Sequence, residues 1–229
     1  RRKNKMPVVS IVGYTNAGKS TIMNQMLAHA NQEEDKQVFE KDMLFATLET
    51  SVRNIELADN KTFLLTDTVG FVSKLPHHLV KAFRSTLEEA RDADLLLHVV
   101  DVSNPEYKFM MDVTNETLKA VGVENIPTIY VYNKSDLANV QYPLVSGDNI
   151  WISAKRAIGL TELIDVIRKQ LFADYIRCEV LIPYDKGSVV SYLNETATIF
   201  NMSYEEEGTL LDLELKQEDF KKYEQYSVK

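Results

Sequence analysis

The sequence is poor in cysteine and has no long run of apolar residues. Cys178 is its one cysteine among 229 residues, so the chain alone forms no internal disulfide and fits a reducing compartment. In the context RCEVLIPY, Cys178 is interpreted as a small hydrophobic residue, with a reactive thiol as the alternative. The longest apolar run is broken at His98, well short of the ~20 residues of a membrane-spanning helix. We therefore expect no signal peptide, no membrane span and a cytoplasmic location.

An excess of positive charge is also lacking. The formal net charge is -8, so the chain as a whole is not built to attract nucleic acid electrostatically. The apolar share of 45% and the charged share of 26% are ordinary for a globular protein that buries its own core. The first residues, RRKNK, form a basic cluster. We interpret residues 1–6 as a solvated tail or as the remnant of a linker from a preceding domain.

Apolar and polar segments alternate between strand and helix patterns, which predicts an α/β fold. The run LLLHVV is typical of a strand buried inside a parallel sheet, and GLTELIDVIRKQL has one apolar helical face. We expect a doubly wound domain over residues 7–173. Its predicted strands are 7–13, 51–58, 61–67, 94–101, 127–133 and 149–153, and its predicted helices are 19–30, 78–91, 107–121 and 159–171. A charged mobile loop is expected over 31–42 and a hairpin turn at 59–60.

A second, smaller α+β domain is expected over residues 174–229. Residues 176–184 and 208–216 have strand patterns, and residues 187–197 and 217–226 have helix patterns. From Ile176 onward there are 11 acidic and 6 basic residues, a local charge of -5. The segment has no G-x-x-G and no stripe of aromatic and basic residues, which argues against a KH or RRM module.

The segment GYTNAGKS matches G-x-x-x-x-G-K-[ST], a phosphate-binding loop between a strand and a helix. Backbone N–H groups of such a loop surround phosphates, and the dipole of the following helix favours the same anion. Lys19 can place its charge on the β- and γ-phosphates, and Ser20 can offer its hydroxyl to Mg²⁺. The predicted nucleotide contacts of this segment are Gly13, Tyr14, Thr15, Asn16, Ala17, Gly18, Lys19, Ser20 and Thr21.

The tetrapeptide Asp67, Thr68, Val69 and Gly70 matches D-x-x-G at the end of a predicted strand. The Asp67 carboxylate can hold Mg²⁺, directly or through water. Gly70 can bring its backbone N–H close to a γ-phosphate because it has no side chain. A plain exit from a strand into a turn is the alternative interpretation of these four residues.

Two further segments predict recognition of guanine. NKSD comprises Asn133, Lys134, Ser135 and Asp136, and SAK comprises Ser153, Ala154 and Lys155. The Asp136 carboxylate can accept from the N1 and N2 donors of guanine, whereas adenine presents an acceptor at N1, and such mismatches discriminate by ~10⁴-fold. Asn133 can tie its loop to the phosphate loop, the Lys134 stem can cover the base, and Ala154 can offer its N–H to O6. Four such segments in this order predict a guanine-nucleotide site.

This order of motifs resembles the translation-factor class of P-loop GTPases, and more closely the HflX family. The segments GYTNAGKST, LFATLET, DTVGF, LPHHLVKAFRSTLEEARDADLLLHVVDVS and NKSD are similar to that family's GTPase domain, and EVLIPYDKGSVVSYLNETA to its small C-terminal domain. The resemblance implies a GTPase that acts on the large ribosomal subunit, on its RNA and protein, and that splits ribosomes under stress. The family's N-terminal domain and helical linker, which make much of the ribosome contact, are absent from this chain. We expect a monomer that binds GTP and GDP.

The resemblance also assigns the switch segment, which comprises Phe45, Ala46, Thr47, Leu48 and Glu49. Thr47 would ligate Mg²⁺ and sense the γ-phosphate when the charged loop closes. Glu49 departs from the aspartate that is frequent in the family, and Ser51 is a minor alternative to Thr47. The predicted catalytic residues are Lys19, Thr47 and Gly70, and the predicted Mg²⁺ ligands are Ser20, Thr47 and Asp67.

Two polar features keep competing interpretations. Asn16 resembles the asparagine of potassium-stimulated GTPases, so K⁺ is a candidate second cation, and a neutral loop asparagine is the alternative. His77 and His78 are adjacent and have no Cys or His partner at metal-ligand spacing, so we interpret them as a helix entry and not as a zinc site.

The residue after D-x-x-G is Phe71, where Ras-like proteins carry a water-positioning glutamine. Phenylalanine can neither accept a proton nor hold a water, so slow intrinsic turnover is expected. Phe71 is interpreted as an apolar gate beside the γ-phosphate or as a core residue. Two functions remain open on this evidence: a GTP-hydrolysing translation factor, and a guanine-nucleotide-gated binding module whose hydrolysis is incidental. An RNA-modifying or RNA-binding GTPase is disfavoured by the acidic tail.

Overall fold

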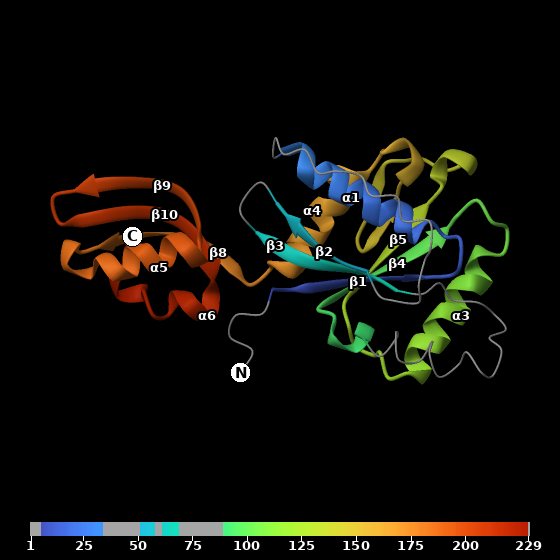
Figure 1. Ribbon diagram of the computed structural model, residues 1–229, viewed down its shortest axis with the longest axis horizontal. Coiled ribbons are helices and arrows are strands. Elements are labelled where there is room, and N and C mark those ends of the chain that lie inside the picture. Colours follow the sequence, from blue (N-terminus) through green and yellow to red (C-terminus); the bar gives the residue numbers. More distant parts are fainter. Residues whose placement is uncertain (1–5, 34–50, 58–60, 69–88, 229) are drawn as a thin grey trace. The chain divides into compact units, whose positions relative to one another are not determined.

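The structure is a computed structural model that describes residues 6–33, 51–57, 61–68 and 89–228 (Figure 1). Its contacts divide the chain into two compact units. The N-terminal unit lies within residues 1–58 and 62–171, and the C-terminal unit consists of residues 59–61 and 172–229. No helix in the described ranges is both long enough and apolar enough to cross a membrane.

The N-terminal unit is built around a mostly parallel sheet with the strand order β2-β3-β1-β4-β5-β7-β6. The five inner strands are parallel to their neighbours, and the edge strands β2 and β6 run antiparallel to β3 and β7. The strand bounds are β1 Val8–Gly13, β2 Ser51–Glu56, β3 Thr62–Asp67, β4 Leu95–Asp101, β5 Thr128–Asn133, β6 Leu144–Ser146 and β7 Asn149–Trp151.

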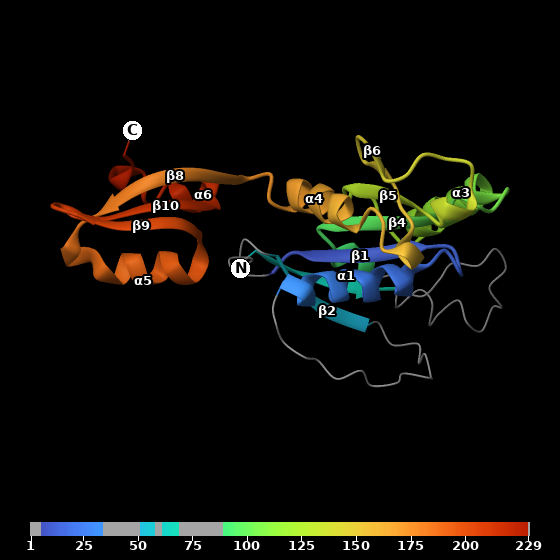
Figure 2. The same cartoon turned by 90° about the horizontal axis from the view of Figure 1, so that it is seen from above.

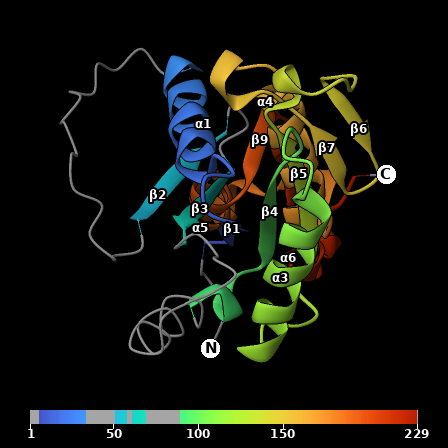
Figure 3. The same cartoon turned by 90° about the vertical axis from the view of Figure 1, so that its right-hand side faces the viewer.

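Helices cover both faces of this sheet (Figure 3). Helix α1, Lys19–Glu33, packs against α4, Leu160–Leu171, on one face. Helix α3, Tyr107–Ala120, lies on the opposite face, where Leu118 packs against Val12 and Leu96. Short 3₁₀ turns occupy Glu89–Asp92, Ser135–Leu137 and Ala154–Arg156. The predicted doubly wound α/β class is thereby confirmed.

The C-terminal unit is an antiparallel sheet with the order β8-β10-β9, covered on one face by helix α5 (Figures 1 and 2). Its elements are β8 Tyr175–Ile182, a 3₁₀ turn Tyr184–Lys186, α5 Gly187–Thr196, β9 Thr198–Glu205, β10 Gly208–Lys216, α6 Gln217–Phe220 and a 3₁₀ turn Glu224–Tyr226. Leu193 of α5 packs on Leu211 and Leu213 of the central strand, because alternate residues of β10 face the helix. The last residues pair along β8, with Val228 N–H donating to Glu179 O at 2.9 Å.

Several predicted elements differ from the observed ones. Strands β6 and β9 were not predicted, and the predicted helix 217–226 is wrong, since only Gln217–Phe220 is α-helical there. The predicted loop 31–42 begins too early, because α1 continues to Glu33, and its last two residues, Gln32 and Glu33, favour helix. The predicted helix 78–91 lies outside the described residues as far as position 88, and its described end belongs to the 3₁₀ turn Glu89–Asp92. Residues 34–42, the turn at 59–60 and the basic residues 1–5 also lie outside the described ranges.

Candidate functional site

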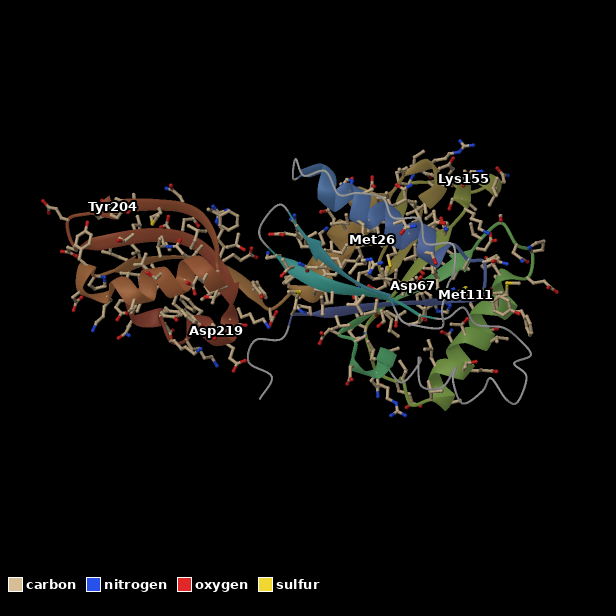
Figure 4. All side chains as sticks on the ribbon, viewed as in Figure 1. Met26, Asp67, Met111, Lys155, Tyr204 and Asp219 are labelled. Carbon is tan, nitrogen blue, oxygen red and sulfur yellow. The ribbon has the colours of Figure 1, made fainter. Side chains whose placement is uncertain are left out.

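The predicted site residues that the structure describes gather at one edge of the N-terminal sheet. Parallel strands β1, β3, β4, β5 and β7 end there with Gly13, Asp67, Asp101, Asn133 and Trp151. In an open α/β sheet this carboxyl edge is where ligands bind. Figure 4 labels Asp67 at the end of β3 and Lys155 in the turn that follows β7.

The loop of residues 14–18 joins β1 directly to α1. A Cβ added to Gly13 would lie 2.3 Å from Val99 O of the neighbouring strand, so only glycine fits this close approach. Asn16 has a left-handed backbone with φ of 60°, and Ala17 N–H closes a turn onto Tyr14 O at 3.2 Å. The loop is thereby wound so that it leads into the N-terminus of α1, where free N–H groups favour an anion.

Lys19, the first residue of α1, is buried and lies against this loop. Its Nζ donates to Gly13 O and to Tyr14 O, both at 3.2 Å. Burial lowers the pKa of Lys19, and the nearby negative charge of Asp67 opposes that shift. The ammonium group is therefore held inside the loop by two carbonyl oxygens and has no carboxylate hydrogen-bonded to it among the described residues.

Ser20 and Asp67 form an oxygen-rich pair beside Lys19. Ser20 Oγ donates to Asp67 Oδ2 at 2.9 Å, while Asp67 Oδ1 is buried without a hydrogen-bond partner among the described residues. Burial raises the pKa of Asp67, opposed by the Ser20 hydrogen bond and the Lys19 charge. Thr68 fixes the strand end, because its Oγ1 donates to Ile11 O at 2.7 Å. An unsatisfied carboxylate oxygen next to a hydroxyl is a donor set that suits a hard divalent cation.

Asn133 links three loops of the site. Its Nδ2 donates to Ala17 O at 3.0 Å, and its Oδ1 accepts from Ala154 N at 3.0 Å. Gly18 must be small here, since an added Cβ would lie 2.3 Å from Asn133 Nδ2. The link that the sequence predicts between Asn133 and the phosphate loop is present. The Ala154 N–H that the sequence assigns to guanine O6 donates to the same side chain.

Asp136 lies in the second half of the site, after β5. Its Oδ1 accepts from Ser153 Oγ at 2.7 Å, and its Oδ2 is 3.4 Å from Arg156 Nε. The Asp136 side chain is only 5% exposed, whereas Arg156 is 57% exposed. Ser153 also caps the 3₁₀ turn Ala154–Arg156 by accepting from Arg156 N. The two motifs therefore hold one buried carboxylate in a fixed position.

Lys134, directly after β5, contacts the end of the neighbouring strand β4. It has a left-handed backbone with φ of 60°, and its Nζ donates to Asp101 Oδ2 at 2.6 Å. Burial would raise the pKa of Asp101, but hydrogen bonds from Lys134 and Ser103 outweigh it and lower that pKa. Ser135 is buried and donates to Tyr132 O at 3.0 Å, which closes the turn.

The structure adds Asp101 and Arg156 to the predicted site. Asp101 is the last residue of the buried strand β4, at the same edge as Asp67, so its position in the sequence could have indicated it. Arg156 directly follows SAK but belongs to no motif, so no sequence signal singles it out. Thr15, Asn16, Thr21 and Lys155 are exposed at the rim. The predicted residues Phe45, Ala46, Thr47, Leu48, Glu49, Val69 and Gly70 lie outside the described residues.

Comparison with known proteins bears on this geometry. The family described as 50S ribosome-binding GTPase matches residues 8–134. The protein called GTPase HflX from Caldanaerobacter subterraneus subsp. tengcongensis is 43% identical over 217 residues, which cover 94% of this chain and 48% of that protein. The protein of the same name from Escherichia coli K12 is 35% identical over 216 residues, covering 92% of this chain and 49% of that protein. The chain thus spans about half the length of the curated relatives it matches.

Solved structures share the fold. A GTP-binding protein from Sulfolobus solfataricus in complex with GDP aligns with a TM-score of 0.55 and 28% identity, covering 72% of this chain and 52% of that one. A point variant of Aquifex aeolicus Era bound to GDP·AlF4⁻ aligns with a TM-score of 0.51, covering 73% of this chain and 57% of that one, and at 23% identity it supports the fold alone. The matched family, the relatives and the site geometry agree, and the chain belongs to the HflX family of GTPases.

Proposed function

We propose that this chain binds and hydrolyses GTP as part of a factor that associates with the large ribosomal subunit. One observation supports the nucleotide site above all: buried Asn133 joins the phosphate loop, through Ala17 O, to the N–H of Ala154, and the neighbouring Ser153 donates to Asp136. The family match and the relatives called GTPase HflX support the activity and the ribosomal partner.

The phosphates are proposed to lie over the loop of residues 13–21. Lys19 Nζ donates to two carbonyl oxygens of this same loop, so the ammonium group already lies beside the proposed phosphate position. It can therefore donate to β- and γ-phosphate oxygens. Ser20 and Asp67 fit Mg²⁺, since a buried carboxylate oxygen lacks a partner beside the serine hydroxyl among the described residues. Bound Mg²⁺ would neutralise the charge that develops on the phosphates. Thr47 is the proposed third ligand.

The base is proposed to lie between Lys134 and Asp136. The ion pair of Lys134 with Asp101 stretches the lysine stem along the edge of the site, where it can cover a planar base. Asp136 would accept from guanine N1 and N2, and the loop of Ser153, Ala154 and Lys155 would face O6. Since Ala154 N–H donates to Asn133, binding O6 requires that this N–H be shared.

Hydrolysis is proposed to depend on position and charge more than on a protein base. Phosphoryl transfer needs little covalent help from the protein, so Lys19 and the loop N–H groups, with Thr47 and Gly70, can supply its stabilisation. Phe71 cannot orient water, so intrinsic turnover should be slow. A ribosomal surface that excludes solvent would accelerate it.

The ribosomal role extends this proposal. We propose that the intact factor splits ribosomes under stress in the cytoplasm, with its main ribosome contacts outside these 229 residues. The net charge of -8 should make this chain alone a weak binder of a polyanion, and the chain should be monomeric.

Asn16, exposed in the phosphate loop, is the proposed contact of a K⁺ ion. Faster hydrolysis in KCl than in NaCl, lost in Asn16→Ala, would support that contact.

Base recognition is tested by a change at Asp136. Asp136→Asn should weaken GDP binding by about 10²-fold or more and shift preference to xanthosine diphosphate, which carries an oxygen where guanine has its amine. Asp148→Asn, on the exposed turn between β6 and β7, is the matched control and should bind GDP as wild type does. Calorimetric titration with GDP, ADP and xanthosine diphosphate measures this. Equal binding of ADP by the wild-type chain would contradict the proposal.

Hydrolysis is tested by phosphate release with and without large ribosomal subunits. Lys19→Ala and Thr47→Ala should lose at least about 10²-fold in single-turnover rate, because each removes charge stabilisation of the transition state. Phe71→Ala should change little, and Lys108→Ala, exposed on α3, should match wild type. A binding module with incidental hydrolysis would show no acceleration by subunits. Loss of all activity in a folded, GTP-binding Phe71→Ala would make Phe71 part of the machinery.

A further inference from the structure

The sheet of the C-terminal unit has one covered edge and one open edge. At the β8 edge the last residues of the chain lie against the strand, where Ser227 forms a bridge with Val180. Val228 N–H donates to Glu179 O at 2.9 Å on the same strand. At the opposite edge, β9 has β10 as its one neighbouring strand within the residues that the structure describes (Figure 1). An open edge presents backbone N–H and C=O groups that a further strand can bond.

Strand β9 carries little of the protection that natural edge strands show. Lysine, proline and bulges are the usual devices against pairing, and the sequence of β9, TIFNMSYE, contains no lysine, arginine or proline. The register with β10 shifts at Phe200, whose ring lies 4.2 Å from the Arg177 guanidinium carbon. This bulge interrupts the first half of the edge. Residues 201–205 continue in regular register with β10, so this stretch is the part that can pair.

The two faces of this stretch define the side chains that an added strand needs. Met202 lies opposite Leu211, which packs under helix α5, so Met202 and Tyr204 extend the face that α5 covers. Both are open to solvent, Met202 at 42% and Tyr204 at 74%, and Figure 4 labels Tyr204 on this strand. Ser203 between them belongs to the other face. A strand added beside β9 should therefore alternate apolar and polar side chains.

The charge around this edge is negative. Residues 187–215, from α5 to β10, contain six acidic residues and no lysine or arginine. Glu205, Glu206 and Glu207 follow one another at the end of β9 and in the turn to β10, and all three are exposed. Such a charge repels nucleic acid and attracts a basic polypeptide. A second copy of the chain would bring two acidic edges together, so a basic segment of a different protein fits better.

We propose that the β9 edge binds an extended, basic segment of another protein by strand addition. The segment runs antiparallel to β9, as β10 does on the other side, and its N-terminal lysine or arginine residues lie beside Glu205, Glu206 and Glu207. Backbone hydrogen bonds supply affinity, and the alternating side chains with the basic end supply specificity. All residues of this partner site belong to the C-terminal unit, so the site goes beyond the proposed GTPase function.

The test titrates the whole chain, without nucleotide, with the synthetic peptide KKKTVTVTV. This peptide should bind with a Kd of about 0.1 mM, shift the amide ¹H–¹⁵N signals of residues 201–205 and slow their hydrogen exchange. The acidic peptide EEETVTVTV should bind at least about tenfold more weakly. KKKTPPVTV should do the same, because adjacent prolines remove backbone donors. No binding of KKKTVTVTV up to about 2 mM, equal binding of a control peptide, or unmoved signals of residues 201–205 would overturn the proposal.

Two double variants test the charge. Glu206→Gln with Glu207→Gln should weaken binding of KKKTVTVTV by about five- to tenfold at low ionic strength. Glu218→Gln with Glu224→Gln makes the same change of net charge at exposed positions beside β8 and should bind as wild type does. Equal losses in both would reduce the binding to general charge attraction and overturn the proposal.

Sedimentation of the chain without peptide tests the competing occupant. The chain should sediment as a monomer, and a dimer with residues 201–205 protected from exchange would make a second copy the occupant and overturn the proposal. Because none of these measurements uses nucleotide, failure of the proposed GTPase function leaves their outcome interpretable.

Discussion

The two units of the molecule differ in how many polar side chains they bury and in what those side chains connect. The N-terminal unit buries polar side chains that bridge loops, including Lys19, Thr68, Asn133 and Ser153. In the C-terminal unit the described core is formed by apolar residues such as Leu193, Leu211 and Leu213. Its Arg177–Asp212 pair lies outside that core, and the buried charge among the described residues of this unit is Lys61, which pairs with Glu214 at 2.6 Å.

This difference shows where the same side chains contribute to both stability and function. A buried hydrogen bond between loops fixes a site and also avoids the cost of unpaired polar groups. In the N-terminal unit a change to a site residue should therefore weaken the fold as well. In the C-terminal unit stability should depend on apolar and backbone packing and be insensitive to its exposed charges, since exposed pairs contribute little.

The largest expected effect is on Asn133. Asn133→Ala leaves the buried Ala17 carbonyl and Ala154 N–H without their partner, at about 1–3 kcal/mol for each group. The free energy of unfolding of the N-terminal unit should fall by roughly 2–6 kcal/mol. Urea titration followed by fluorescence of Trp151, the one tryptophan, measures this.

The matched control for this prediction is Asn149→Ala. Asn149 also donates to a backbone carbonyl, Ser146 O at 3.2 Å, but in an exposed turn where water can replace it. It should unfold close to wild type. Equal losses in both variants would show that burial of the polar links is not what distinguishes the N-terminal unit.

The two units also differ in how much of their structure the sequence predicts. The motifs of the N-terminal unit predict its fold and place Asn133, because each motif needs fixed residues at fixed spacing. The sequence can place Asp101 at this edge, but its pairing with Lys134, and that of Arg156 with Asp136, depends on which strands are neighbours, and the sequence alone does not show that.

In the C-terminal unit the two errors have separate causes. Strand β9 was missed although Phe200, Met202 and Tyr204 alternate with polar residues, which is a strand pattern. In the fold these three side chains are exposed on an edge strand. The predicted helix 217–226 is wrong because Phe220, Tyr223 and Tyr226 pack on the core at intervals of three residues. That interval suits 3₁₀ turns better than an α-helix.

The second prediction concerns acid and His98. Its pKa is about 4 in the fold and 6.5 ordinarily, so between these values the unfolded chain binds the extra proton. The contribution of His98 to the stability of the N-terminal unit should be constant at pH values well above 6.5 and should fall by about 3 kcal/mol as pH drops to 4. Urea midpoints across this range measure it.

His98→Leu isolates this contribution from other titrating groups. Between pH 6.5 and pH 4 the free energy of unfolding should fall less in this variant than in wild type, and the difference is the contribution of His98. The C-terminal unit has no histidine, so its amide exchange should show no matching loss. An unchanged pH dependence in His98→Leu would mean that His98 is protonated in the fold as readily as outside it.

The smallest expected effect belongs to the backbone of the C-terminal unit. A Cβ added to Gly208, at the start of β10, would lie 2.2 Å from Ile182 O, which is backbone and must shift. Gly208→Ala should cost about 1–3 kcal/mol by overpacking. Gly187→Ala, at the start of α5 with nothing within 4 Å, should be neutral or slightly stabilising because alanine favours helix. Amide exchange of β10 in both variants separates the two. The loss of stability should be confined to the C-terminal unit, and GDP binding should be unchanged, because no hydrogen bond of the nucleotide site described here involves β10. A Gly208→Ala variant that bound GDP more weakly would show that the two units are not independent in stability.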